Sequence, residues 1–400
     1  MELRPWIQSS RREPYELLFT ARARAALAGT GPIKDALMTL AQWQGRTLLD
    51  TLARPKPGIS LTLGEVASRT EKLGPWLAAI SSAPFARPAE EATVLATIAT
   101  IDLLVLVVAD GHVWRLSARR GRFGIKDLGL REALQNKIDA LKRALGDLAL
   151  AAELGDQVLP EDTFDHPGET LHVLLDGSIA GWPLPALARN RRRLIAVRPL
   201  VRVQQLPEIP CIAPTRSGHN TVLGDSTGDL ADAEREAREV ATRLDTTPVL
   251  GAAATSNALF AATGDSVLHL ALHADVDASG STLRLADQRV YAPEISARGL
   301  GPSLVVLLAC KSAQAMDGEQ AGSLATAFLA AGSAQVVATL RDIEDLKTPE
   351  LARRFYAAGG VRDPVRALAK VQAELSEPAA NNRDWPYFAV FGHDICPATP

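Results

Sequence analysis

Two residues able to perform nucleophilic catalysis, His273 and Cys310, each lie at the end of an apolar segment. His273 follows VLHLAL at 267–272, and Cys310 ends LVVLLAC at 304–310. A cysteine beside an imidazole can become a thiolate at neutral pH, and the thiolate is the competent nucleophile. If the two segments are neighbouring parallel strands, about 4.8 Å apart, their ends bring these side chains within reach of each other. The sequence therefore permits a Cys/His catalytic pair.

Both residues also have a structural interpretation. Free cysteine is among the most buried residue types, so an Ala-Cys pair at the end of an apolar strand is also typical of a core. His269 and His273 are spaced like a helical metal-binding pair, but in a strand they lie roughly 13 Å apart, too far to share one ion. Ser226 in VLGDSTGD resembles the exposed serine of some esterases, yet its Gly and Asp neighbours favour a turn.

The elements that must position these residues alternate along the chain. Such alternation of buried strands with helices predicts a largely parallel sheet covered on both faces. A hairpin at 282–291 and a short helix after Pro293 separate the two strands that carry His273 and Cys310. The apolar runs lie at 171–175, 200–206, 221–224, 267–272, 304–310 and 335–340, and the helical patterns at about 230–244, 255–263, 322–331, 349–358 and 364–375.

The N-terminal part has a different pattern. Helices are predicted at 15–28 and 33–52, followed by an antiparallel meander from the apolar runs at 92–99, 102–109 and 113–118. A long amphipathic helix starts at Leu130, and 155–168 has the acidic, proline-containing composition of a linker. We therefore divide the chain into an N-terminal helical region (1–57), a meander with a long helix (58–154) and a core (155–400).

Composition and missing motifs exclude several classes of protein. The 47% hydrophobic content suffices for a core, and a net charge of -3 argues against nucleic-acid or polybasic membrane binding. Three widely spaced cysteines make no disulfide framework, and neither a secretion signal nor a membrane span is recognisable, so we expect a cytoplasmic protein. HExxH, GxGxxG and GxxxxGK do not occur, so no metal and no cofactor is expected.

The region from about Leu171 to Gly392 resembles a CHAT domain, a caspase- and separase-like family of cysteine peptidases often found beside helical repeats. The blocks that carry this resemblance occur in the family's order. The lead-in IATIDLLVLVVADGHVWRLSA at 98–118 and the helix at 130–150 are also similar to the family's. The blocks are LHVLLDGSIAGWPLPAL (171–187), DLADAEREAREVATRL (229–244), VLHLALHAD (267–275), LVVLLACKSA (304–313), GSLATAFLAAGSAQVVATL (322–340), FYAAGG (355–360), DPVRALAKVQAEL (363–375) and WPYFAVFG (385–392).

The resemblance implies a caspase-like α/β fold and assigns roles to residues. The histidine of the family's H-x-x-x-H-G block falls on His273, and the cysteine of its S/A-C-x-S block falls on Cys310. Backbone N–H groups near Ala274 and Cys310 are then expected to hold the oxyanion. Two positions depart from the family, since Ala274 replaces the usual glycine after the second histidine and Arg341 replaces a tryptophan. The methyl group of Ala274 is expected to restrict positive φ.

The resemblance also implies a substrate preference and a function. The family's aspartate in the loop LRDIEDLKT falls on Asp345, with Asp342 nearby, which implies cleavage after a basic residue. A solvated acidic turn that caps the next helix is the alternative. The expected function is a cytoplasmic endopeptidase that cleaves a protein partner in regulated proteolysis such as bacterial defence or cell-death signalling. An activating protein would bind the N-terminal helices. The alternative is an inactive CHAT pseudoprotease that binds its partner without cutting it.

Overall fold

The computed structural model describes residues 12–43, 91–204, 206, 211–212, 218–277, 280–308, 312–313, 323–343, 348–377, 380, 382–392 and 394–395. Three residues of interest, Cys310, Asp345 and Cys396, lie outside this part of the chain, as does the portion of the expected helix after Trp43.

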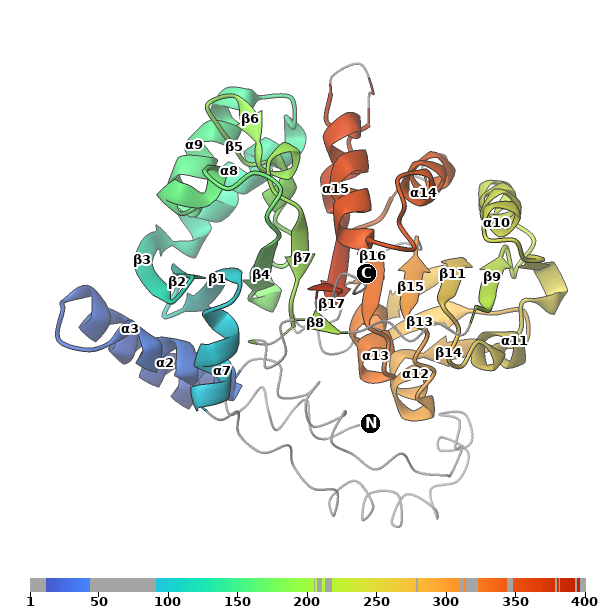
Figure 1. The fold of residues 1–400 in the computed structure, drawn as a ribbon, viewed down its shortest axis with the longest axis horizontal. Helices are drawn as coiled ribbons and strands as arrows, with labels where there is room; N and C mark the ends of the chain where they lie inside the picture. The colour runs from blue at the N-terminus through green and yellow to red at the C-terminus, as the bar shows by residue number, and fades with distance from the viewer. Residues whose placement is uncertain are drawn as a thin grey trace, which may run out of the picture.

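A mostly parallel sheet forms the centre of the described chain (Figure 1), as the sequence predicts. The strand order is β10-β9-β11-β15-β16-β17-β7-β4-β1-β2-β3. Pairing is parallel from β10 to β16 and again from β17 to β1, whereas β17 is antiparallel to β16 and the meander β1 to β3 is antiparallel. The strands are β1 (Asp102–Ala109), β2 (His112–Arg119), β3 (Arg122–Leu130), β4 (Leu171–Leu175), β7 (Leu200–Arg202), β9 (Asn220–Gly224), β10 (Val249–Leu250), β11 (Val267–Ala271), β15 (Leu304–Leu307), β16 (Gln335–Thr339) and β17 (Phe388–Gly392).

Helices cover both faces of the core half of this sheet, since its strands are apolar on both sides. One group consists of α10 (Ala231–Arg243), α14 (Thr348–Ala357) and α15 (Pro364–Leu375), and the other of α11 (Ser256–Ala261), α12 (Ala292–Arg298) and α13 (Leu324–Ala330). The two groups lie above and below the strands in Figure 1. The predicted caspase-like layering, helix on sheet on helix, is therefore present.

The meander half is also covered on both faces. Alternate residues of β1 point to opposite sides, so Leu104 and Leu106 join the core under α8 (Arg131–Arg143) and α9 (Leu148–Val158). Leu103 and Val105 instead join the core under α2 (Arg12–Leu27), α3 (Ile33–Trp43) and α7 (Glu91–Ile98). The N-terminal helices thus pack on the sheet that also carries the core strands.

Three of the expected elements are corrected by the structure. The apolar run at 92–99 is the helix α7 rather than a strand, and the helix expected from Leu130 breaks after Arg143. Asp147 caps α9 by accepting hydrogen bonds from the backbone N–H of Ala149 and Leu150. The expected linker at 155–168 is largely structured, because α9 continues to Val158. Gly155 allows this, since a Cβ there would lie 1.9 Å from the carbonyl oxygen of Ala188.

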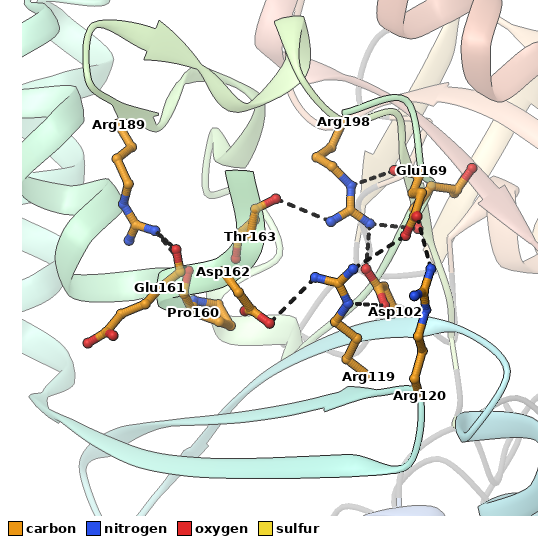
Figure 2. Close-up of polar contacts among 11 residues, drawn as sticks. Asp102, Arg119, Arg120, Pro160, Glu161, Asp162, Thr163, Glu169, Arg189 and Arg198 are labelled. Atoms are coloured by element: carbon orange, nitrogen blue, oxygen red, sulfur yellow. Dashed lines mark hydrogen bonds and ion pairs between the residues drawn. The ribbon is translucent and has the colours of Figure 1, made fainter. Parts of the chain in front are cut away.

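A buried ion network joins the meander to the core strands (Figure 2). Arg198, 1% exposed, donates from Nη2 to Oδ2 of Asp102 at 2.8 Å and from Nη1 to the carbonyl oxygen of Thr163 at 3.2 Å. Arg119 on β2 contacts the other oxygen of Asp102, with Nε 3.3 Å from Oδ1. The sheet and this network both run across the expected boundary at 154/155. The three-region division remains a prediction.

The remaining strands form small sheets. Directly after β11 the chain forms a separate antiparallel sheet of β12 (Ala274–Asp277), β13 (Gly280–Arg284) and β14 (Arg289–Tyr291), in that order. β5 (Ala188–Arg189) pairs with β6 (Arg192–Arg193), and β8 (Cys211–Ile212) with β18 (Asp394–Ile395). Across the described residues, none of the helices has the length and apolar character needed to cross a membrane.

Candidate active site

His273 lies at the carboxyl edge of the sheet, between the end of β11 and the start of β12. Its backbone is fixed, because its carbonyl oxygen accepts a hydrogen bond from the N–H of Arg284 at 3.0 Å. Its side chain is 31% exposed, and its Nε2 lies 3.0 Å from Oδ1 of Asp229. The imidazole is thus accessible to solvent and oriented by a carboxylate through one ring nitrogen.

Asp229 belongs to the loop between β9 and α10, and this loop is held in shape by its own hydrogen bonds. Asp225 has a φ of 43°, and its carboxylate accepts from the N–H of Leu230 at 2.9 Å. The hydroxyl of Thr227 donates to the same oxygen of Asp229 that contacts His273. These hydrogen bonds, from Thr227 first and then His273, lower the pKa of Asp229 below its ordinary value. Asp229 is therefore an ionised carboxylate near neutral pH.

The sequence predicts this loop only as a turn around Ser226. Ser226 is indeed buried, and its hydroxyl donates to the carbonyl oxygen of Arg284 at 2.6 Å, which ties the turn to β13. Asp229, the last residue of the same GDSTGD segment, is not among the site residues predicted from the sequence. The position of Asp229 after a strand could have indicated its role, because that strand, β9, pairs with β11 on the side opposite β15.

Cys310 lies outside the described residues, but the strand that leads to it is described. The first four residues of β11 each pair with the residue 37 positions later in β15, from Val267 with Leu304 to Leu270 with Leu307. His273 and Cys310 are separated by the same 37 positions, and each comes three residues after the last of these pairs. The register is therefore compatible with the expected dyad.

The chain after Cys310 is tightly anchored through Ser312, which is fully buried. Its hydroxyl donates to the carbonyl oxygen of Leu307 at 3.1 Å and accepts from the N–H of Thr339 at 3.0 Å. The next residue, Ala313, donates its N–H to the carbonyl oxygen of Thr339 at 2.9 Å. Ser312 and Ala313 are thus bound to the end of β15 and to β16.

Ala274 is the first residue of β12, and its backbone has no positive φ. The expected restriction of positive φ by the methyl group therefore has no effect here, because the backbone of Ala274 is extended and extended backbone suits any residue. The hydrogen bond from Arg284 to His273 sets the pairing phase of β12 with β13. In an antiparallel pair, residues alternate between facing the partner strand and facing away, so the N–H of Ala274 points away from β13.

The residues of the expected specificity loop are only partly described. Asp342 is exposed, and Asp345 lies outside the described residues. Arg341, which replaces the family's tryptophan and precedes this loop's acidic residues, forms an ion pair with Asp384. Its guanidinium also lies over the ring of Tyr387, 3.9 Å from the ring centre. Among the described residues, Asp384 therefore provides the carboxylate that pairs with Arg341.

His269 does not share a metal site with His273. It is fully buried, with Nε2 3.0 Å from Oε1 of Glu236 on α10 and Nδ1 3.1 Å from the hydroxyl of Tyr356 on α14. Burial, more than the charge of Glu236, raises the pKa of Tyr356 well above its ordinary value. Over the described part of the chain, no group of three or more His, Cys, Asp or Glu side chains could hold a metal ion. His269 therefore joins two helices to the sheet.

Comparisons with known proteins agree with this fold. The CHAT domain family model matches residues 135–393. Two crystal structures of the separase–securin complex of Saccharomyces cerevisiae are similar in fold, one with a TM-score of 0.58 at 9% identity and one with 0.52 at 10%. The matches cover 90% and 76% of this chain but 34% and 31% of the matched chains, so the chain spans about a third of those proteins. No curated protein matches the sequence.

Proposed function

The chain belongs to the CHAT domain family, and we propose on that premise that it is a cysteine endopeptidase whose Cys310 and His273 cleave a protein partner at a restricted site. The observation that carries this proposal is the position of His273 in the strand order. β11 lies between β9, whose following loop carries Asp229, and β15, the strand that precedes Cys310 in the sequence. With Cys310 as the nucleophile, this order would supply the base, orienting acid and nucleophile that cysteine peptidases need.

In the proposed reaction, His273 takes the proton of the Cys310 thiol, and the sulfur attacks the peptide carbonyl carbon. The resulting oxyanion accepts hydrogen bonds from the backbone N–H groups of Ala274 and Cys310, and such a donor is often worth about 3 kcal/mol of barrier. The imidazolium then protonates the leaving amine as the C–N bond breaks. A water molecule deprotonated by His273 hydrolyses the thioester, and the returning proton restores the thiol.

Asp229 acts in this scheme as a positioning residue. Because Nε2 of His273 lies against its carboxylate, the proton is held on Nε2, and Nδ1 remains to exchange a proton with the thiol. The carboxylate also stabilises the imidazolium, since Asp229 is ionised.

We further propose that the enzyme is cytoplasmic, that regulated proteolysis in defence or cell-death signalling is its setting, and that an activating protein binds the N-terminal helices. Exposed apolar side chains on α2 support the last point, since Leu17 is 64% and Leu27 49% exposed. Burying such side chains against a partner would be favourable.

Cleavage after a basic residue is the proposed specificity, with Asp345 as the charged group and Asp342 beside it. Arg341 does not oppose this role through the contacts described, because it pairs with Asp384. Peptide-library profiling tests the proposal: a preference for arginine or lysine that is weakened in Asp345→Ala supports it. A preference for acidic or large apolar residues removes Asp345 from the substrate pocket.

The proposed function is tested by labelling the protein with an electrophilic peptide probe whose terminal residue is arginine. We expect the probe to modify Cys310 first, and Cys310→Ala and His273→Ala to lose both labelling and cleavage while keeping the fold. Cys211→Ala is the matched control and should behave like the wild type. If the folded protein neither reacts at Cys310 nor cleaves peptides, it is a pseudoprotease that only binds its partner.

A further inference from the structure

We propose that the free edge of β12 binds an extended segment of the substrate as an additional β-strand, which aligns the scissile bond with His273. This inference rests on the proposed function and deepens it, because it states how the polypeptide substrate is held. In β-strand addition, main-chain hydrogen bonds give affinity with little demand on side-chain identity.

The edge is open within the described part of the chain. β12 is the first strand of the three-stranded sheet, with β13 on one side and none of the described strands on the other. The pairing phase places residues 273 and 275 toward β13, so Ala274 and Val276 direct their N–H and C=O groups to the open side. Two residues thus offer donors and acceptors in the spacing that a peptide strand requires.

The edge is also continuous with the catalytic histidine. β12 begins at the residue after His273, so the N–H of Ala274, the proposed oxyanion donor, is the first group of the open edge. Val276 follows about 7 Å further along the strand, the span of two residues in any extended chain. A peptide whose scissile carbonyl lies at Ala274 therefore reaches Val276 with its neighbouring residues, without a change of direction.

β13, the strand that pairs with β12, is well buried, and the charged side chain of β12 nearest the edge, Asp275, is paired. Thr282 and Leu283 of β13 are fully buried, which holds β12 in place. Asp275 pairs with Arg284, at 3.0 Å between Oδ2 and Nη2, and has Arg289 at 3.9 Å. Charged side chains commonly protect sheet edges from unwanted pairing, but this carboxylate is already neutralised by two cations.

The length of the edge favours a substrate peptide over a second copy of this chain. Only two outward-facing residues are available in a strand of four, and a strand pair this short has little stability by itself. A substrate, in contrast, is also held at the reacting carbonyl and by side-chain subsites, so two further main-chain contacts suffice to orient it.

The test compares Val276→Pro with Val276→Thr on a long and a short substrate. Proline removes the outward N–H without removing a hydrogen bond to β13, and threonine keeps it. With a peptide extending four residues to each side of the cleaved bond, we expect Val276→Pro to lower kcat/KM about tenfold, and Val276→Thr less than twofold. With a two-residue fluorogenic amide, both variants should match the wild type.

A second measurement uses the unchanged protein, so that a folding defect in the proline variant cannot decide the outcome. Long peptides N-methylated at one position at a time should be cleaved more slowly when alternate residues beside the scissile bond are methylated. Undiminished cleavage of the long peptide by Val276→Pro, or the same rate for every methylated peptide, would overturn the proposal. Cleavage of the short amide by the wild type shows in either case that the peptidase function itself holds.

Discussion

Replacing Ser312 with alanine should loosen the segment that carries Cys310. The hydroxyl of Ser312 satisfies two buried backbone groups, the carbonyl of Leu307 and the N–H of Thr339. Alanine leaves both without that partner in a place that water does not reach, and each such loss costs about 1–3 kcal/mol. We therefore expect the free energy of unfolding to fall by about 2–6 kcal/mol, and alkylation of Cys310 to become slower.

Ser333→Ala is the matched control. Ser333 is also buried, but among the described residues its hydroxyl has no hydrogen-bond partner, so its removal should change stability by less than about 0.5 kcal/mol. Urea denaturation of the two variants and the wild type gives the comparison, with iodoacetamide modification of Cys310 measured by mass spectrometry. Equal stability of Ser312→Ala and Ser333→Ala would refute the anchoring role of Ser312.

Further expectations concern the positioning acid and two buried groups. Asp229→Asn should lower kcat while changing KM little, and it should change the pH profile of Cys310 alkylation. An unchanged pH profile would contradict the positioning role of Asp229. Asp102→Asn should cost about 3–5 kcal/mol in urea denaturation because Arg198 stays buried and charged, with much of this recovered in Asp102→Asn/Arg198→Met. Burial lowers the pKa of His172 from 6.5 to about 4, so the unfolded chain alone binds a proton between these values and stability falls as the pH falls from 6.5 to 4. His172→Leu should show less of this acid sensitivity in thermal melts.

The buried strands could be predicted because their signal is local. Continuous apolar runs bounded by polar loops indicated β11, β15 and β16, and the structure has strands there. The segment at 92–99 was misjudged for the same reason, since EATVLATI is apolar enough for a strand and too short for a clear helical period. Its helical state follows from packing: Val94 and Ile98, one helical turn apart, are buried against the meander.

Prediction of the candidate site from the sequence pattern was incomplete, because some of its contacts form only in the tertiary structure. His273 and Cys310 were identified from their positions after apolar runs and from the family blocks, but nothing in the sequence states that Asp229 reaches His273. That contact requires the positive φ of Asp225 and the tie from Ser226 to β13, which bring together residues 44 positions apart. Arg198 and Asp102, 96 positions apart, show the same limit.

The position of β17 has a consequence for how this chain folds during synthesis. β17, residues Phe388–Gly392, lies between β16 and β7 and is the only described strand that joins the two halves of the large sheet. β17 is translated after all the other strands of that sheet. Two incomplete half-sheets, each with an unpaired edge, therefore emerge from the ribosome before the strand that joins them. Nascent chains should therefore depend on chaperones until this last step, and the final join, made between distant parts of the sequence, should be slow.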